Sequence, residues 1–278
     1  MVRTLKLPAG LFRGCEVMKF SIFNFQFSIS RKKIIFSAIF ILLGLISLQI
    51  PISILVGAKV KFTLFDLFAP ISGAFLGSFF GIFAVVVMQL LNLIIHGFTN
   101  IDNSSVLKLA ATLRFLPMAF GVWFFARASR YYSSSERSES RSSRQARTIE
   151  RLILLIPLLS IIIFNLHPIG RTVWFYSLFW FIPLLVWPFR QRFLVARSLG
   201  STFTAHAVGG AVWIWAFNLP AAVWISLIPV VILERSIFAL GIGASYIFLN
   251  NILALLSKNR MLAGVFSFDK KYVLGFLK

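Results

Sequence analysis

Long apolar runs separated by short polar stretches are the main pattern of this chain. A helix that crosses a bilayer needs about 20 predominantly apolar residues. The first run that meets this requirement covers 34–56 and follows three basic residues, Arg31, Lys32 and Lys33. This run is too long for the core of a signal peptide, and no small-residue cleavage pattern follows it. We therefore expect an uncleaved membrane helix.

The next apolar run, 62–95, is too long for one span. As a single straight helix it would measure roughly 50 Å, against a hydrocarbon core of about 30 Å. The pattern therefore predicts two spans, 62–78 and 79–96, with a break near Gly77 and Gly81. Gly73, Gly77 and Gly81 recur every four residues, and glycines at this interval let two helices approach backbone to backbone.

The last apolar run, 222–256, is interrupted by Glu234 and Arg235. We predict one membrane helix that begins near Ala222 and passes Glu234, with Gly241 and Gly243 loosening it and a cytoplasmic or interfacial continuation to 256. The other expected spans are 107–127, 151–167, 172–188 and 201–218. The fold class is therefore an all-α integral membrane protein with about eight transmembrane helices.

Composition agrees with a membrane protein and excludes other classes. Of the 278 residues, 59% are hydrophobic and 13% are charged, with a mean hydropathy of +0.88. A soluble enzyme or a disordered regulator of this length would be far more polar. The single cysteine, Cys15, excludes a disulfide framework.

The distribution of charge predicts the orientation. The net charge is +20, and basic residues concentrate on the cytoplasmic side of membrane proteins. With the N-terminus inside, eight spans leave 22 of the 28 Lys and Arg residues in cytoplasmic segments. We therefore expect a multi-pass protein of the cell membrane with both termini in the cytoplasm. The expected parts are a cytoplasmic tail (1–30), a first transmembrane half (31–127), a linker (128–150), a second transmembrane half (151–256) and a basic C-terminal tail (257–278).

The linker at 128–150 is rich in Ser and Arg and cannot bury a core. Two interpretations are open, a nucleic-acid-binding arm and a solvated linker near anionic lipid headgroups. We favour the linker, since each basic residue near such a surface gains about 1 kcal/mol. Nucleic acid is therefore not an expected partner, whereas membrane lipids are.

The sequence lacks the motifs of several reaction classes. It contains no GxxxxGK[ST] phosphate loop, no HExxH and no GxSxG elbow. The chain is therefore not expected to hydrolyse ATP through such a loop. Three histidines, His96, His167 and His206, are too dispersed to predict a metal site. We predict no catalytic residues, no metal and no cofactor.

Charged residues within apolar segments carry the functional signal, because a charge at the centre of a membrane helix costs about 2.5–3.5 kcal/mol on insertion scales. Asp66, Arg114 and Glu234 lie within predicted spans. One interpretation is an outward-open polar cavity for a small charged or hydrogen-bonding molecule. The other is that Arg114 pairs internally with Glu234 or Asp66, while Arg235 extends to the inner headgroups.

Two further groups of polar or aromatic residues extend the candidate site. Asn92 and His96 are four residues apart and share one helix face. The span 201–218 places small residues, including Gly209, where a neighbouring helix could pack closely. Its other half carries Trp213, which could stack a planar ring, and Asn218. The predicted substrate-binding residues are Asp66, Asn92, His96, Arg114, His206, Trp213 and Asn218, and the predicted helix-packing residues are Gly73, Gly77, Gly81 and Gly209.

The segment KVKFTLFDLFAPISGAFLGSFFGIFAVVVMQLLNLIIHG, residues 59–97, resembles the second and third helices of the substrate-specificity (S) components of energy-coupling-factor (ECF) vitamin transporters. The resemblance rests on an extended entry followed by a helix with glycines at every fourth position. It implies a six-helix binder of small molecules, working with a transmembrane coupling subunit and separate ATPase subunits. The AxxxA face of that family is absent, since Leu42 follows Ala38 by four residues. The six-helix core would then exclude 151–188 as an inserted helical hairpin.

We therefore expect a membrane-embedded subunit that captures a vitamin-like or nucleobase-like molecule from outside for uptake, and not an enzyme. Two alternatives stay open. One is a lipid-modifying transferase with His206 or Glu234 as the base. The other is a scaffold that recruits partners through its basic linker.

Overall fold

The computed structural model of the chain describes residues 17–22, 25–54, 61–96, 115–129, 151–258 and 268–275, and within these it is mainly helical. The α-helices are α1 (Arg31–Leu48), α2 (Phe65–Leu76), α3 (Ser78–His96), α5 (Phe115–Ala128), α8 (Leu155–Leu166), α9 (Pro168–Thr172), α10 (Ile182–Val186), α11 (Leu194–Phe217) and α12 (Ala221–Lys258). The 3₁₀ helices are η1 (Trp174–Phe181), η2 (Trp187–Phe189) and η3 (Lys270–Tyr272). The strands are β1 (Val17–Ile22), β2 (Phe25–Ser30), β3 (Pro51–Ile54) and β4 (Lys61–Thr63).

The two small antiparallel sheets were not part of the predicted fold class. Strands β1 and β2 pair with Val17 opposite Ser30, and β3 pairs with β4. Apolar and polar residues alternate in the segment before Arg31, and this alternation is the ordinary signal of a strand. The predominantly helical architecture is nevertheless the one that the apolar runs predict.

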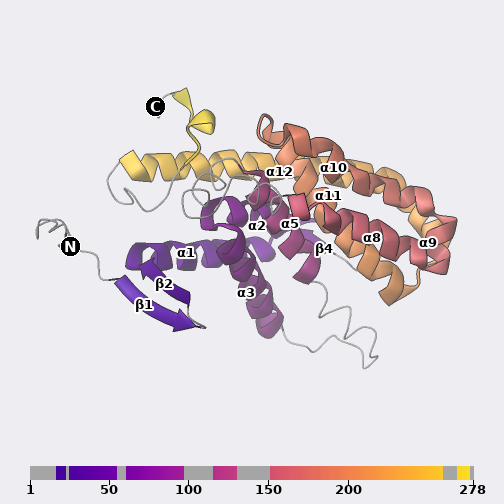
Figure 1. Cartoon of the computed structure of the whole chain (residues 1–278), viewed down its shortest axis with the longest axis horizontal. Coiled ribbons are helices and arrows are strands. Elements are labelled where there is room, and N and C mark those ends of the chain that lie inside the picture. The colour runs from indigo at the N-terminus through magenta and orange to yellow at the C-terminus, as the bar shows by residue number, and fades with distance from the viewer. Residues whose placement is uncertain are drawn as a thin grey trace, which may run out of the picture.

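The long helix α12 runs along the longest axis of the molecule and joins its two ends (Figure 1). Helices α8, α9, α10 and α11 gather at one end of the view, and α1 with its β-hairpin lies toward the other. At 38 residues and 1.5 Å per residue, α12 is about 57 Å long. It is continuous through Gly241 and Gly243, so the predicted single helix in this region is found.

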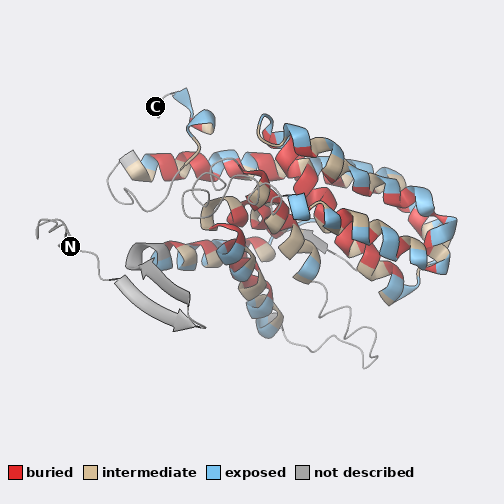
Figure 2. Cartoon of the chain, viewed as in Figure 1, coloured by how far each residue is buried: buried red, intermediate tan, exposed pale blue. Residues whose placement is uncertain are grey.

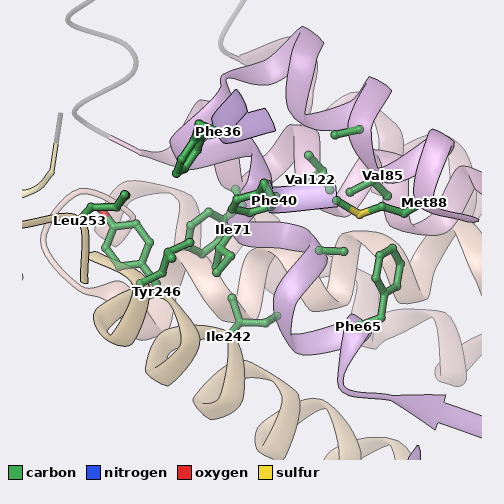
Figure 3. Close-up of a cluster of buried hydrophobic side chains, with 14 of the residues drawn as sticks. Phe36, Phe40, Phe65, Ile71, Val85, Met88, Val122, Ile242, Tyr246 and Leu253 are labelled. Carbon is green, nitrogen blue, oxygen red and sulfur yellow. The ribbon is translucent and has the colours of Figure 1, made fainter. Parts of the chain in front are cut away.

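Two clusters of buried side chains pack against the two halves of α12. The larger cluster, shown in Figure 3, combines α1, α2, α3 and α5 with the C-terminal half of α12, including Ile242 and Tyr246. The second cluster combines α8, η1 and α11 with the N-terminal half of α12, including Trp224 and Val231. Glu234 and Arg235 therefore lie between two apolar clusters.

The glycine-containing turn between α2 and α3 falls where the length argument predicts it. Helix α2 ends at Leu76, and Gly77 has φ 89° and ψ 170°, a conformation that is essentially restricted to glycine. Helix α3 begins at the next residue, Ser78. A Cβ on Gly81 would lie 2.8 Å from the Gly73 Cα, so Gly81 serves helix packing rather than the turn.

Apolar side chains also cover outward-facing surfaces of these helices, where Figure 2 shows exposed residues alternating with buried ones along each helix. On α1, the exposed residues Ile35, Ile39, Leu42 and Ile46 follow helical spacing. By length and composition, two helical segments of the described chain are able to cross a membrane, Ser78–Ile95 and Ala221–Ser257. Other apolar helices of the described chain are shorter, with 10–17 residues.

Candidate functional site

Arg235 is the centre of a polar cluster between the two apolar clusters. Its Nη1 donates to Thr202 Oγ1 on α11 at 3.4 Å, and its Nη2 lies 3.5 Å from Glu234 Oε2. The side chains of Arg235 and Glu234 are only 8% and 12% exposed. The hydrophobic pattern places this pair near the middle of α12, and the α11–α12 hairpin brings Thr202 opposite it. The result is a buried cation with one acidic and one hydroxyl partner.

Asp66 belongs to the same electrostatic environment. It lies in the first turn of α2, where its carboxylate accepts a hydrogen bond from the Thr63 backbone N–H at 2.8 Å. A carboxylate at a helix N-terminus is stabilised by the exposed N–H groups of the first turn. Asp66 also interacts with the charges of Arg235 and Glu234. The cluster therefore joins α2, α11 and α12.

His206 joins the cluster through Tyr176. The Tyr176 hydroxyl and His206 Nε2 are 3.2 Å apart, which links η1 to α11 by a hydrogen bond. The His206 ring also faces Trp180 and Phe203, with centroid distances of 6.2 and 6.3 Å. His206 and Tyr176 both interact electrostatically with Arg235. An imidazole and a phenol are thus hydrogen-bonded to each other within the electrostatic influence of a buried guanidinium.

Two tryptophans lie next to this pair. Trp180 and Trp224 are 0% and 1% exposed, and both make edge contacts with Phe164 at a centroid distance of 5.1 Å. Within the part of the chain that the structure describes, neither indole N–H has a hydrogen-bond acceptor. Buried indole N–H groups usually find a partner. The aromatic side of the cluster therefore offers two donors in addition to its ring faces.

Together these side chains form what we call the polar cluster: Asp66, Tyr176, Thr202, His206, Glu234 and Arg235. It contains cationic, anionic and neutral hydrogen-bonding groups next to aromatic rings. Among the described residues, no group of three or more His, Cys, Asp or Glu side chains could hold a metal ion.

Of the predicted substrate-binding residues, Asp66 and His206 lie in the polar cluster, whereas three others lie elsewhere. Asn92 on α3 accepts a hydrogen bond from Gln49 Nε2 at 2.9 Å. Trp213 packs against Phe217, with ring centroids 5.9 Å apart. Asn218 is exposed, and its left-handed backbone, φ 45°, makes the turn between α11 and α12. These three roles are local contacts rather than parts of one site.

Two predicted site residues lie outside what the structure describes. Arg114 is in the range 97–114, for which no placement is given, and the side chain of His96 is likewise not described. The Ser- and Arg-rich linker at 130–150 is also outside the described residues.

The expectation that Arg235 extends to the inner headgroups is wrong. Its side chain is buried, and it is Arg235 that pairs with Glu234 and interacts with Asp66. Arg114 and Arg235 both fall within apolar segments of the sequence, and only the packing of α11 on α12 reveals the partners of Arg235. Tyr176 and Thr202 were missed because hydroxyl residues in apolar helices are common and carry no signal by themselves.

The helix-packing glycines of α11 also differ from the expectation. A Cβ on Gly209 would be 3.7 Å from Pro117, an ordinary contact. In contrast, a Cβ on Gly200 would collide with the Phe124 ring, and one on Gly210 would meet the Trp180 ring at 2.5 Å. Close packing on α11 therefore depends on Gly200 and Gly210, because they face large aromatic rings.

Comparison of the chain with protein-family models, with curated proteins and with solved structures gives no match.

Proposed function

We propose that this chain is a multi-pass membrane protein and the substrate-binding subunit of an uptake system of the ECF type. The observation that carries the proposal is the polar cluster around Arg235. A buried charge in an apolar helix marks a binding site or a pathway by default, because the cost of burying it needs a compensating role. The ligand is a small, planar, polar molecule of the vitamin or nucleobase kind.

The outward-facing side chains support insertion into a bilayer. On α12, Leu233, Leu240 and Phe248 are 64%, 63% and 70% exposed. On the opposite surface of the same helix, Trp224, Val231 and Ile242 are buried. A helix that is hydrophobic all round belongs in a protein core or a membrane. Since one side of α12 faces no protein among the described residues, lipid is the environment that fits it.

The distribution of basic residues supports an orientation. Arg127 lies in the last turn of α5, Arg151 precedes α8, and Arg190 and Arg192 precede α11. Packing joins these segments at one end, since Ile153 and Trp187 share a cluster with Phe124. We assign this end to the cytoplasm. The α11–α12 turn at Asn218 then faces outward.

The helix order supports the family assignment. Helices α1, α2, α3, α5, α11 and α12 supply six elements of 12 to 38 residues, and the segment from α8 to η2 is an additional hairpin between α5 and α11. This order corresponds to a six-helix S component with an insertion. The absence of a phosphate loop fits a subunit that relies on separate ATPases for energy. A transmembrane coupling subunit is then the second expected partner.

Ligand retention tests the proposal. The full chain is purified in mild detergent and analysed by native mass spectrometry, and its melting temperature is measured with a panel of vitamins and nucleobases. We expect a retained small molecule or stabilisation by one panel member. Arg235→Gln and Thr202→Val should both reduce this retention or stabilisation. Arg171→Gln serves as the matched control, since Arg171 is exposed and contacts only carbonyl groups of Asn165 and Leu166.

Absence of any retained molecule together with no stabilisation by the panel would overturn the proposal. Equal ligand retention by wild type, Arg235→Gln and Thr202→Val would also overturn the assignment of the site. Two variants are used because Thr202→Val preserves side-chain volume and removes only one partner of Arg235.

The His206–Tyr176 hydrogen bond favours a second candidate function, a membrane-embedded transferase that acts on lipid. A histidine hydrogen-bonded to a phenol can act as a general base, and Arg235 could hold a phosphate. Loss of lipid turnover in His206→Ala with unchanged small-molecule retention would support this candidate. Unchanged lipid turnover in His206→Ala would reject it.

A further inference from the structure

The C-terminal segment 268–275 is fixed to the end of α12 by two consecutive asparagines. Asn250 Nδ2 donates to the Asp269 carbonyl at 3.0 Å, and its Oδ1 accepts from the Asp269 N–H at 2.7 Å. Asn251 repeats this arrangement, donating to the Tyr272 carbonyl at 2.9 Å and accepting from the Leu274 N–H at 2.8 Å. Each side-chain amide thus hydrogen-bonds to two backbone groups of the segment, which fixes the register of the segment on the helix.

This docking brings two basic segments together. Lys271 Nζ donates to the Arg192 carbonyl at 2.6 Å, so η3 lies against the loop that precedes α11. Tyr272 packs over the buried Arg197 guanidinium, 5.6 Å from ring centroid to Cζ. The two segments that this contact joins carry Arg190, Arg192, Lys270 and Lys271, which we call the basic rim.

The basic rim has little negative charge of its own. Within the described segments 187–193 and 268–275, Asp269 is the acidic residue, and its carboxylate already accepts the Lys271 backbone N–H at 3.0 Å. Within these two segments the basic residues outnumber the acidic one by four to one, so the segments carry a net positive charge. Such a charge attracts an anion from outside the chain.

Apolar side chains accompany these cations. Phe189, Phe193 and Leu274 are 54%, 49% and 47% exposed. The Arg190 guanidinium stacks on Trp187, 4.0 Å from the ring centroid. Aromatic side chains interleaved with cations are typical of a surface at the headgroup level of a bilayer. A free inorganic anion would make no apolar contact with the exposed aromatic rings, whereas the acyl chains of a lipid would.

We infer that the basic rim is a binding site for anionic phospholipid headgroups and that it is assembled by docking of the C-terminal segment on Asn250 and Asn251. The headgroup phosphate lies beside Arg192 and Lys271, and the acyl chains follow Phe189 and Phe193. The inference rests on the proposed insertion into a membrane and is independent of the ligand at the polar cluster.

Lipid competition tests the inference. The full chain is exposed to equal amounts of phosphatidylglycerol and phosphatidylcholine in mixed micelles, and the retained lipids are counted by native mass spectrometry. We expect a preference for phosphatidylglycerol that falls about fivefold for each cation removed, the change that corresponds to about 1 kcal/mol per basic residue. The variants are Arg192→Gln, Lys271→Gln and the two combined, with Arg171→Gln as a control of equal charge at the opposite end.

Docking is tested without changing any charge. Asn250→Ala combined with Asn251→Ala should reduce the preference as strongly as Lys271→Gln, because Lys271 loses its position beside Arg192. The melting temperature of each variant shows whether the remaining fold is intact, and Lys271→Gln keeps the test valid if the double alanine variant does not fold.

Three results would overturn the inference. The first is an equal retention of the two lipids by wild type, and the second is an unchanged preference in the combined Arg192→Gln and Lys271→Gln variant. The third is displacement of phosphatidylglycerol by inorganic phosphate at equal concentration, which would identify a free-anion site. Arg235→Gln should leave the lipid preference unchanged, so failure of the proposed function and failure of this inference are distinguishable.

Discussion

Replacing Gly81 with alanine should destabilise the protein relative to the same replacement at Gly209. Both glycines lie in described helices, and helix propensity favours alanine over glycine by about 1 kcal/mol in each case. The difference between the two variants therefore reports tertiary packing alone.

The packing at the two positions differs, and this difference determines which variant is the less stable. A Cβ on Gly81 would meet the Gly73 Cα at 2.8 Å and its N at 2.9 Å, whereas a Cβ on Gly209 would be 3.7 Å from the Pro117 side chain. Backbone atoms cannot rotate away, so α2 and α3 would have to separate. Overpacking of this kind costs about 1–3 kcal/mol. We expect Gly81→Ala to be less stable than Gly209→Ala by this amount.

The assay is reversible unfolding in mixed micelles, with the fraction of SDS increased stepwise and helicity followed by circular dichroism. Comparing the transition midpoints at equal slope gives the difference in the free energy of unfolding. Substitutions without a structural effect usually change the free energy of unfolding by less than about 0.5 kcal/mol. A difference between the two variants below this value, or a Gly81→Ala variant more stable than Gly209→Ala, would refute the close approach of α2 and α3.

Three further substitutions have expected outcomes in the same unfolding assay. Gly77→Ala should cost about 1–3 kcal/mol, because φ 89° and ψ 170° strain any residue with a Cβ, and an unchanged midpoint would contradict the α2–α3 turn. Tyr176→Phe should cost about 0.5–1.5 kcal/mol through loss of the hydrogen bond to His206, and Tyr176→Leu should cost more because it also removes the ring; an unchanged midpoint for Tyr176→Phe would show that the hydroxyl contributes nothing. Arg235→Leu should cost about 3–5 kcal/mol because Glu234 stays buried without its cation, and Arg235→Leu combined with Glu234→Leu should recover much of this loss; no recovery would contradict the pairing.

The arrangement of apolar runs was sufficient to predict most helices. The break at Gly77 follows from length alone, because 34 apolar residues exceed one bilayer thickness. The single helix through Glu234 and Arg235 follows from the charge distribution, because two spans over 222–256 would place the basic C-terminal tail outside. In both cases the length and charge of the segments, read along the chain, predict the helix that the structure has.

The second expected span of the 151–188 hairpin has a different local structure. Instead of one α-helix over 172–188, the chain forms η1, α10 and η2 in succession. Pro183 and Pro188 lie in the first turns of α10 and η2, where a missing backbone N–H is tolerated, so each proline stands where a new helical segment begins. The 3₁₀ geometry of η1 places Tyr176 and Trp180 toward α11, where both are buried. The prolines are visible in the sequence, but their effect on Tyr176 is not.

The composition of the polar cluster could be predicted only in part. Asp66 and His206 stand out as polar residues in apolar runs, and the charge of Arg235 acts on both. The choice between an internal partner and the headgroups for Arg235 depends on the register of α11 against α12, which places Thr202 opposite it. Register between helices is a long-range property that the periodicity of one helix does not contain.

The orientation of the α11–α12 hairpin in a membrane tests the central claim most directly. Single cysteines are introduced at Pro220 and at Leu274, both exposed, in a chain in which Cys15 is replaced by serine. Right-side-out membrane vesicles are then treated with a membrane-impermeant maleimide. We predict that Pro220→Cys is labelled in intact vesicles and that Leu274→Cys is labelled only after permeabilisation. Labelling of Leu274→Cys in intact vesicles, or equal labelling of both sites, would contradict the orientation on which the outward-facing binding site depends.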